Sequence, residues 1–454
     1  MELYVEVTMN ILGISEGFHD AAICVVRGRK ILHASHSERY SRIKNDPWVH
    51  PSQWPISNRN QPDIVAYYEK PFRKNLRRLW AGQKWQKPRV NYSYCFGHHE
   101  SHAAAGYYTS PFDECNILVI DAIGEWDTMS IWHAKGGLMI KKTSWKYPHS
   151  LGLLYSAITQ RIGLKPNEDE YITMGMAAFG EPKYNLENQL WENNHRGVGN
   201  IFPKASNEDL AASIQALYER ELLKLVELCP HENLVFMGGC ALNCAANSKI
   251  KGKNIWIMPA AGDAGSALGA AALVLKEKLE WKNPYLGYPI LGGLHVDKVV
   301  KELEENRIVG VANGKAEFGP RALGNRSLLA DPRWPKIKDT VNNIKRRQKF
   351  RPFAPAILDE FKDEYFEGPM NEYMQFVSKA KHDYTSVTHV DGTARVQVVK
   401  QGCGSLLREI LEKWYERTGC PMLLNTSLNI KGQPMVNTWE DAKEWSKTYN
   451  VPVF

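Results

Sequence analysis

The stretch that decides the fold spans residues 9–40: MNILGIS (9–15), EGFHD (16–20), AAICVVRGR (21–29) and KILHASHSERY (30–40). Its three apolar runs are rich in isoleucine, valine and alanine, and short polar or glycine-containing turns separate them. Runs of this length bounded by such turns are typical of strands, and tight turns join antiparallel neighbours. The stretch therefore predicts three consecutive antiparallel strands.

Two later segments each combine a strand, a glycine-rich loop and a helix: NLVFMGGCALNCAANSKI (233–250) and NIWIMPAAGDAGSALGAAAL (254–273). Such loops let backbone N–H groups and a helix N-terminus approach a phosphate or a ribose. An antiparallel opening followed by two such units is typical of actin-like (ASKHA) ATP-binding domains. We therefore expect a nucleotide pocket, although the chain has neither a Walker A motif nor a G-x-G-x-x-G motif. The expected nucleotide-binding residues are Gly238, Gly239, Asn243 and Gly262.

Length and composition limit the class of protein. A chain of 454 residues predicts two or three domains. Its hydrophobic fraction of 43% and charged fraction of 24% are ordinary for a globular protein. No apolar run approaches the roughly 20 residues of a membrane span, and no signal peptide is evident at the start. The eight cysteines are scattered without a C-x-x-C motif, as free thiols in a reducing cytosol are. We expect a cytoplasmic protein with no membrane partner.

A change in composition marks a domain boundary. Residues 277–296 (EKLEWKNPYLGYPILGGLHV) are rich in proline and glycine, and a helical pattern and a strand follow them. We therefore predict two domains, 9–284 and 285–454.

Two histidines four residues apart, His98 and His102 in FGHHESHAAA, point to a metal. Residues at this spacing share one helix face, where a single ion can bridge them. The apolar run NILVI then places Asp121 at the end of a strand. This set predicts a mononuclear site with mixed nitrogen and oxygen ligands. The alternative is that the histidines are only surface or cap residues.

A basic and aromatic stretch precedes the two histidines. Between Arg73 and Arg89 the chain has seven basic residues and no acidic one, interrupted by Trp80 and Trp85. Basic and aromatic side chains together neutralise phosphates and stack on bases. The alternative is a solvated helix whose tryptophans point toward the core.

Motifs along nearly the whole chain resemble the O-carbamoyltransferases of the nodulation-factor and antibiotic-tailoring type, including those of the tobramycin and cephamycin pathways. This resemblance implies an α/β protein with an ASKHA N-terminal domain and a smaller YrdC-like C-terminal domain, similar to the threonylcarbamoyl-AMP synthases. The matching segments are ILGISEGFHDAA, SERYSRIKND, HHESHAAAGYY, LVIDAIGEWD, SLGLLYSAIT, MGGCALNCAAN, GDAGSALGAA, EFGPRALGNRSLLADP, FRPFAPAIL, THVDGTARVQVV and PMLLNTSLNIKGQPMV.

The resemblance implies a reaction in two steps. The C-terminal domain makes carbamoyl-adenylate from carbamoyl phosphate and ATP, which binds with Mg, and releases pyrophosphate. The N-terminal domain then transfers the carbamoyl group to an acceptor hydroxyl and releases AMP. Its metal is Fe(II), with Mn(II) or Zn(II) as alternatives, and the implied ligands are His98, His102, Asp121 and Asp263. Asp263 has the alternative role of capping the helix that follows it.

Further site residues follow from the same resemblance. His19 in the FHD turn lies where the family has a histidine of the transfer site, and its alternative is a turn histidine that bonds to the neighbouring backbone. Lys44 in SRIKND is an expected catalytic residue that offsets phosphate charge, or else an ordinary lysine of a solvated loop, and His99 is an expected acceptor contact. Carbamoyl phosphate is a small dianion, and guanidinium groups bind its oxygens in bidentate fashion. Surface salt bridging is the alternative role for the arginines. The expected carbamoyl-phosphate-binding residues are Arg321, Arg351, Arg395, Asn425 and Ser427, with Arg326 and Arg347 as weaker candidates.

One departure from the resemblance concerns a lysine. Relatives usually carry a lysine where this chain has Ile172, in EYITMGMA.

The acceptor hydroxyl is predicted from the position of the basic stretch. Because the basic stretch with Trp80 and Trp85 lies just before the metal helix, we expect a nucleic-acid or nucleotide acceptor, such as the 5-hydroxymethyl group of a modified pyrimidine (hydroxymethylcytosine) in DNA. The alternatives are a sugar or antibiotic hydroxyl, and a non-catalytic nucleotide-binding or tRNA-modification partner. The oligomeric state stays open between monomer and homodimer.

Overall fold

The first sheet contains the strands expected at the start of the chain, in a computed structural model that describes residues 9–53 and 62–454. Its strand order is β3-β2-β1-β4-β5. β1, β2 and β3 pair antiparallel, whereas β4 and β5 continue the sheet in parallel on the other side of β1. The strands are Asn10–Ser15 (β1), Ala22–Arg27 (β2), Lys30–His36 (β3), Ile64–Tyr67 (β4) and Tyr94–Cys95 (β5).

The second sheet repeats this arrangement with different residues. In its order, β10-β9-β6-β7-β8, β6 pairs antiparallel with β7 and β7 with β8, whereas β9 and β10 follow in parallel on the other side of β6. Two sheets of this topology in tandem form the actin-like fold, which confirms the fold predicted from the opening strands. The strands are Glu114–Gly124 (β6), Asp127–Lys135 (β7), Leu138–Lys146 (β8), Asn233–Met237 (β9) and Asn254–Trp256 (β10).

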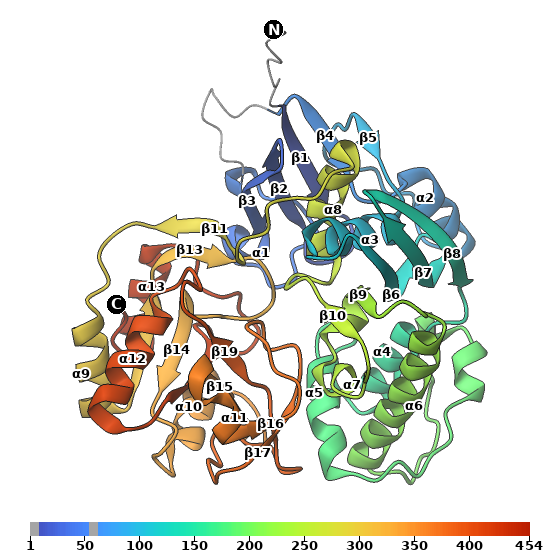
Figure 1. Ribbon diagram of the computed structural model, residues 1–454. Helices are drawn as coiled ribbons and strands as arrows, with labels where there is room; N and C mark the ends of the chain where they lie inside the picture. Colours follow the sequence, from blue (N-terminus) through green and yellow to red (C-terminus); the bar gives the residue numbers. More distant parts are fainter. Residues whose placement is uncertain (1–8, 54–61) are drawn as a thin grey trace, which may run out of the picture.

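Two helices, α3 (His98–Thr109) and α8 (Asp263–Leu275), pack against each other between the sheets (Figure 1). α8 lies on the first sheet and α3 on the second. Their close approach requires glycine, because a Cβ at Gly269 would lie 1.8 Å from the carbonyl oxygen of Ser101. This packing brings the N-terminal ends of the two helices together.

The remaining helices of the first part include one long helix, Asn207–Glu227. Its N-cap is Ser206, whose hydroxyl accepts the N–H of Asp209. The α-helices are Glu38–Ser41 (α1), Pro71–Trp80 (α2), Leu151–Arg161 (α4), Glu170–Met176 (α5), Asn207–Glu227 (α6) and Cys244–Asn247 (α7). The 3-10 helices are Pro51–Gln53, Ala177–Phe179, Asn188–Trp191, Asn194–Arg196 and Gly239–Leu242.

The C-terminal part has a sheet of its own, with the order β12-β14-β20-β15-β19, and the final residues of the chain run beside β12 (Figure 1). The Ala312 N–H donates to the carbonyl of Phe454. The strands here are Tyr285–Ile290 (β11), Ile308–Ala312 (β12), Gly314–Glu317 (β13), Arg326–Ala330 (β14), Ala354–Leu358 (β15), Phe366–Glu367 (β16), Ser378–Ala380 (β17), Thr393–Ala394 (β18), Gln397–Val399 (β19) and Met422–Ser427 (β20). The helices are Val296–Asn306 (α9), Ile337–Lys345 (α10), Lys362–Tyr365 (α11), Leu407–Thr418 (α12) and Trp439–Tyr449 (α13), with a 3-10 turn at Asp359–Phe361.

The hydrophobic cores separate along the chain. One core is built almost wholly from residues between Ile11 and Leu286. Two others lie on opposite faces of the C-terminal sheet, since the neighbours Leu328 and Leu329 of β14 belong to different clusters. On this basis we propose the domain boundary at residues 284/285.

Two further observations bear on the class of protein. Among the described residues, no helix is both long and apolar enough to cross a membrane. All eight cysteines are free thiols, as their scattered spacing predicts.

Candidate metal centre and anion site

Four predicted ligands meet where α3, β6 and α8 converge. The Nε2 atom of His98 lies 2.9 Å from a carboxylate oxygen of Asp121, and the Nε2 atom of His102 lies 3.2 Å from one of Asp263. The two Nε2 atoms are 3.2 Å apart. One potential ligand atom from each of the four residues lies within 4.8 Å of all the others. Side chains that the chain places 161 residues apart therefore form one cluster.

The local structure explains why these side chains point inward. His98 is the first residue of α3, and His102 lies one turn further, buried like His98. Asp263 is the first residue of α8, whose N-cap is Gly262, and its carboxylate lies 3.2 Å from Nε2 of His102 and 3.4 Å from Nε2 of His98. The alternatives that the histidines are surface residues and that Asp263 only caps its helix are both wrong.

The charges within this cluster support one another. Burial alone would lower the pKa of His98, but the charge of Asp263 and the hydrogen bond to Asp121 raise it well above its ordinary value. Burial alone would raise the pKa of Asp263, but the charge of His98 and the hydrogen bond from His102 hold it far below its ordinary value. The carboxylates therefore stay ionised, as metal ligands must be.

A residue that sequence reasoning missed supports the cluster from behind. An oxygen of Glu69, which follows β4, lies 4.0 Å from Nδ1 of His98, and a second oxygen lies 2.5 Å from Nζ of Lys74. A carboxylate behind a ligating histidine fixes the orientation of its ring. The signal in the sequence was a carboxylate after an apolar run, as for Asp121 after NILVI. The strand end predicted at Asp121 is wrong, because β6 continues to Gly124 and Asp121 lies within it.

His19 lies in the turn after β1 and faces the same cluster. Its Nδ1 atom lies 3.1 Å from a carboxylate oxygen of Asp20, which has a positive φ of 52°. Burial alone would lower the pKa of His19, but this hydrogen bond and the charges of Asp263 and Asp121 raise it to about 9. Its side chain is 29% exposed, so it can be reached from solvent.

His99 is buried and turned away from the other two rings. Its Nδ1 atom lies 2.8 Å from the hydroxyl of Ser130 on β7. Burial, with the charge of His98, lowers the pKa of His99 to about 3, so the ring is neutral. Its acceptor contact stays a prediction.

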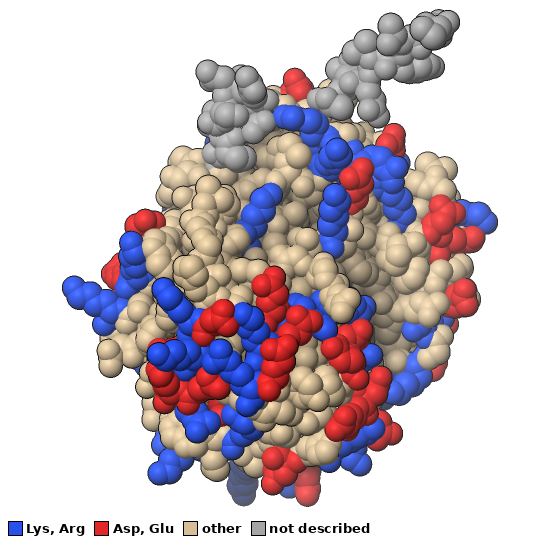
Figure 2. Space-filling view, turned by 60° about the vertical axis from the view of Figure 1, so that its left-hand side comes forward, with Lys and Arg blue, Asp and Glu red and all other residues tan. Residues whose placement is uncertain are grey.

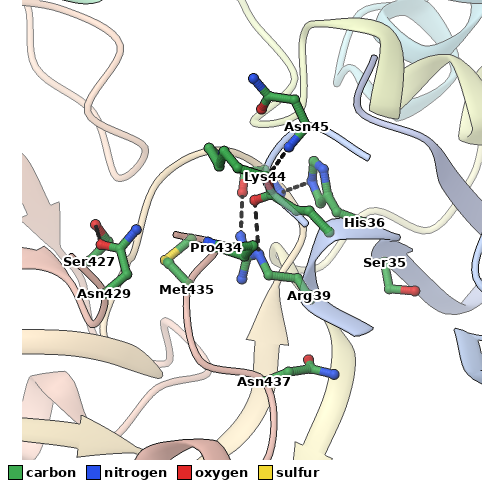
Figure 3. Close-up of polar contacts among 12 residues, drawn as sticks. Ser35, His36, Arg39, Lys44, Asn45, Ser427, Asn429, Pro434, Met435 and Asn437 are labelled. Carbon is green, nitrogen blue, oxygen red and sulfur yellow. Dashed lines mark hydrogen bonds and ion pairs between the residues drawn. The ribbon is translucent and has the colours of Figure 1, made fainter. Parts of the chain in front are cut away.

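Lys44 lies near the seam between the two parts of the chain. Its Nζ atom donates to Glu38 at 2.7 Å, and its charge contributes to lowering the pKa of Asp20. Two residues before Lys44, Arg42 donates to the carbonyls of Pro434 and Met435 of the C-terminal part, and Figure 3 labels these two residues with Lys44. The segment that carries Lys44 thus contacts the C-terminal part.

The predicted nucleotide loop touches the metal cluster. The N–H of Gly239 donates to Asp121 at 3.3 Å. Gly238 has a φ of 94°, and a Cβ there would lie 2.1 Å from the carbonyl oxygen of Ile120, so only glycine fits. Asn243 caps α7 and also bonds to Gln215. The loop therefore brings free backbone next to a candidate ligand, whereas the Asn243 side chain already has partners.

Three predicted arginines form a second cluster, in the C-terminal part. Burial and the charge of Arg395 lower the pKa of Arg321 to about 9, with a smaller effect of Arg351. Among the described residues, no carboxylate lies within ion-pair distance of any of the three. Arg395 also has a buried Nε atom without a hydrogen-bond partner. A group of guanidiniums without counter-ions is a site for an anion.

Two more cations belong to this cluster. Arg347, at first a weaker candidate, has its pKa lowered by burial and by Arg351 and Arg395. Sequence reasoning missed Lys345, which is buried at the end of α10 and donates to the carbonyl and hydroxyl of Ser427. The helical pattern before Lys345 gives no sign that its last residue turns toward a site.

The other predicted anion-binding residues divide into two groups. Asn425 is buried and donates to Gln397 and to the carbonyl of Ala322, beside Arg321. Ser427 contacts Lys345, so both lie with the cluster. Arg326 does not belong to it: its side chain is fully buried and donates only to backbone carbonyls, those of Tyr288, Asn313, Gly314, Asn325 and Asn437.

The arginine cluster faces helix α5 of the N-terminal part. The guanidinium carbon of Arg351 lies 4.6 Å from the centre of the Tyr171 ring. Phe179, just after α5, packs against Phe350 and His389. Ile172, at the position where the resemblance leads us to expect a lysine, is fully buried.

The basic stretch forms α2 and the loop after it. Trp80 is 64% exposed and Trp85 is 47% exposed. The alternative in which the tryptophans point toward the core is therefore wrong.

Together, the duplicated actin-like sheets, the buried His–Asp cluster and the opposed arginine cluster describe a group-transfer protein built from two unlike parts. Comparison with known proteins gives the family. Residues 65–200 and 193–272 match the carbamoyltransferase N-terminus, and residues 300–454 match the carbamoyltransferase C-terminus. The chain belongs to the carbamoyltransferase family.

Individual relatives extend over most of the chain. It is 32% identical to an uncharacterised protein of Synechocystis sp., over 95% of this chain and 93% of that protein. It is 30% identical to nodulation protein NolNO of Sinorhizobium fredii, over 93% of this chain and 76% of that protein. It is 31% identical to nodulation protein NolO of Bradyrhizobium diazoefficiens, over 76% and 75%.

Similar solved structures are more distant. HypF of T. kodakarensis matches 59% of this chain and 48% of its own, with 11% identity and a TM-score of 0.35. A ROK family glucokinase from Streptomyces griseus matches 58% of this chain and 98% of its own, with 13% identity and a TM-score of 0.33. At these scores the fold assignment rests on the strand topology described above.

Proposed function

We propose that this carbamoyltransferase makes carbamoyl-adenylate in its C-terminal domain and transfers the carbamoyl group to a hydroxyl at the His–Asp cluster. The observation that carries the proposal is the pairing of two sites. One is a converging set of two histidines and two aspartates. The other is a set of arginines without counter-ions, facing α5 of the N-terminal domain.

In the first step, carbamoyl phosphate, ATP and water give carbamoyl-adenylate, pyrophosphate and inorganic phosphate. The bond from the carbamoyl group to its phosphate breaks, and a carbamate oxygen forms a bond to the α-phosphorus of ATP as pyrophosphate leaves. Arg321, Arg351 and Arg395 are suited to hold the phosphate of the donor through bidentate hydrogen bonds. Lys345, with Ser427, adds a buried cation at the same place.

The residues of the His–Asp cluster fit a divalent metal such as Fe(II), Mn(II) or Zn(II). Two imidazole nitrogens point at each other at 3.2 Å and two ionised carboxylates adjoin them, a donor set that suits these ions. When bound, the metal would supply Lewis acidity toward the adenylate. His98 and His102 from α3, Asp121 from β6 and Asp263 from α8 would hold it.

In the second step, the acceptor hydroxyl oxygen forms a bond to the carbamoyl carbon. The bond from that carbon to the AMP oxygen breaks, and AMP leaves with the electron pair. In this proposal His19 receives the proton of the hydroxyl. Its high pKa is due in part to Asp121 and Asp263, and neutralising these carboxylates by ligation would return it toward neutral pH, where a base works best.

For the acceptor, we propose the 5-hydroxymethyl group of a modified pyrimidine, in DNA or as a nucleotide. The support is the exposed basic and aromatic surface of α2, since Lys74 of this helix reaches Glu69 behind His98. A duplex base would have to be flipped out to reach the cluster. A small sugar or antibiotic hydroxyl is the second candidate, since it needs only a polar pocket.

The proposal is tested by supplying carbamoyl phosphate, ATP, Mg²⁺ and Fe(II). Hydroxymethylated DNA, the matching nucleotide and a panel of sugars serve as acceptors. We expect pyrophosphate release and, by mass spectrometry, an acceptor heavier by one carbamoyl group. Neither product on any acceptor would overturn the enzyme function, whereas a carbamoylated sugar alone would overturn the pyrimidine acceptor.

A further inference from the structure

Helix α2 (Pro71–Trp80) is inverted: its polar side is buried and its apolar side faces solvent. Lys74 donates to Glu69 and to the carbonyl of Gly17, and Asn75 exchanges hydrogen bonds with the backbone of Gln86. The exposed fractions are 64% for Phe72, 46% for Leu76, 51% for Leu79 and 64% for Trp80. A surface helix normally does the opposite, so this exposed face requires an explanation.

The charge around the exposed face has one sign. From Lys70 to His99 the chain has no acidic residue. Exposed cations flank the apolar side chains: Arg73 on the helix, and Lys84 and Lys87 in the loop after it. A nucleic-acid strand matches both features, since its phosphates pair with cations and its flat bases stack on rings.

The C-terminal domain provides a contrast. Figure 2 shows acidic and basic side chains mixed on the face that lies to the left in Figure 1, where α9 and α12 pack together. There Lys413 pairs with Asp297, and Arg417 pairs with Glu304. Lys413 and Arg417 are thus neutralised in pairs, whereas none of the described carboxylates lies within 4.0 Å of the charged groups of Arg73, Lys84 and Lys87.

A row of rings leads from α2 toward the metal cluster. Trp80 lies 6.0 Å from the ring of Trp126 and 5.7 Å from that of Tyr147. Trp126 follows Glu125, which accepts the N–H of Lys70 at the start of α2. Two residues before Trp126, Gly124 packs so closely on the His98 ring that a Cβ would lie 2.2 Å from it. The exposed rings and the ligand cluster thus belong to one continuous structure.

From these observations we propose that Phe72, Trp80 and Trp85 form a stacking platform for an unpaired nucleic-acid strand, whose phosphates contact Arg73, Lys84 and Lys87. This inference rests on the proposed function for its purpose, since the platform would hold the bases beside a pyrimidine that enters the metal cluster. It specifies a single strand, because bases offer their faces to rings only when they are unstacked.

The test is equilibrium binding of a fluorescent, unmodified 12-nucleotide DNA strand, without ATP, carbamoyl phosphate or metal. We expect Trp80→Leu to weaken binding about 5- to 100-fold, because it keeps an apolar side chain but loses the ring. Leu79→Ala is the matched control on the same face, and we expect less than about a twofold change, since it removes no ring. Thermal unfolding of both variants should match the parent chain.

Salt dependence tests the phosphate contacts. Lys84→Gln should reduce the slope of log affinity against log salt by about 0.7, the value for one phosphate of a single strand. Lys413→Gln, which removes a cation already paired with Asp297, should leave the slope unchanged.

Three results would overturn the platform: no binding of the strand at low salt, tighter binding of a duplex of the same length, or equal losses in Leu79→Ala and Trp80→Leu. Equal losses accompanied by loss of a concentration-dependent dimer would assign the face to a second copy of the chain. Because binding needs no chemistry, strand binding without carbamoyl transfer would overturn the proposed function and leave the platform standing.

Discussion

The His–Asp cluster and the arginine cluster differ in how their buried charges are balanced. In the first, each histidine lies within 3.2 Å of a carboxylate, so the buried charges neutralise one another. In the second, burial and like charges lower the pKa values of Arg321, Arg347 and Arg351 together. The first cluster is therefore assembled by its own contacts, whereas the second is held together by the fold against its own repulsion. Binding of an anion should therefore stabilise the second cluster.

The largest effect is expected from breaking the first cluster. His102→Ala removes a ligand and leaves Asp121 and Asp263 facing each other without that partner. We expect carbamoyl transfer to fall on the order of 10³-fold or more, since the Lewis acid loses its site. Pyrophosphate release from ATP and carbamoyl phosphate should continue, because it belongs to the other domain. Metal content by mass spectrometry and the two product assays check this.

A remote histidine serves as the control for this substitution. His149 stacks on Trp191, and His149→Ala should change neither metal content nor transfer. If His102→Ala kept its metal, or lost pyrophosphate release to the same extent as transfer, the assignment of transfer to the His–Asp cluster and of pyrophosphate release to the arginine cluster would be wrong.

Breaking the second cluster should lower activity and raise the stability of the ligand-free protein. We expect Arg321→Met to lower pyrophosphate release about 100-fold, because a charged hydrogen-bond donor to the donor phosphate is lost. The ligand-free variant should nevertheless unfold at a higher temperature than the parent chain, since it removes a buried like charge. Added phosphate should raise the unfolding temperature of the parent chain and not that of the variant.

An arginine that has its counter-ion gives the matched comparison. Arg333 pairs with Asp331 at 2.9 Å and lies over Trp414. Arg333→Met should lower the unfolding temperature and leave pyrophosphate release intact. A lower unfolding temperature in both arginine variants would contradict the idea of an uncompensated cluster.

The pH dependence of stability distinguishes two kinds of buried histidine. Carboxylates raise the pKa values of His98 and His102, so these rings are protonated. His36, near the boundary between the domains, is neutral, and its Nε2 atom accepts the N–H of Gly319. Burial and Arg39 lower its pKa to about 4. Below about pH 6.5 the unfolded chain binds a proton at His36, whereas the folded chain does not bind it until the pH falls to about 4. The free energy of unfolding therefore decreases as the pH drops through this range.

Denaturant unfolding at two pH values measures this effect. Between pH 7 and pH 5, we expect the parent chain to lose about 2 kcal/mol more stability than His36→Gln, which keeps an acceptor but cannot titrate. An equal loss in both chains would mean that His36 takes up its proton as readily in the folded chain as in the unfolded chain.

How far the sequence predicts these sites depends on how local their geometry is. The spacing of His98 and His102 predicts a shared helix face, and Asp121 directly follows the apolar run NILVI, so both features are visible in short segments. Lys345 and Glu69 were missed because only tertiary packing turns them toward the clusters. Arg321 and Arg326 occupy one motif, and only the fold shows that carbonyls enclose Arg326, whereas Arg321 is left for an anion.

The smallest expected effect concerns the ring that faces the arginine cluster from the other domain. Tyr171 is the residue beside the missing lysine, and it offers Arg351 a π-face where a second cation would add repulsion. We expect Tyr171→Ala to raise the KM for carbamoyl phosphate about 3- to 10-fold, the range of one partly buried cation–π contact. Tyr171→Phe, which keeps the ring, should restore most of this loss. A fall in kcat for transfer, with KM unchanged, would instead show that α5 serves the metal centre and that the two clusters are less independent than their charges indicate.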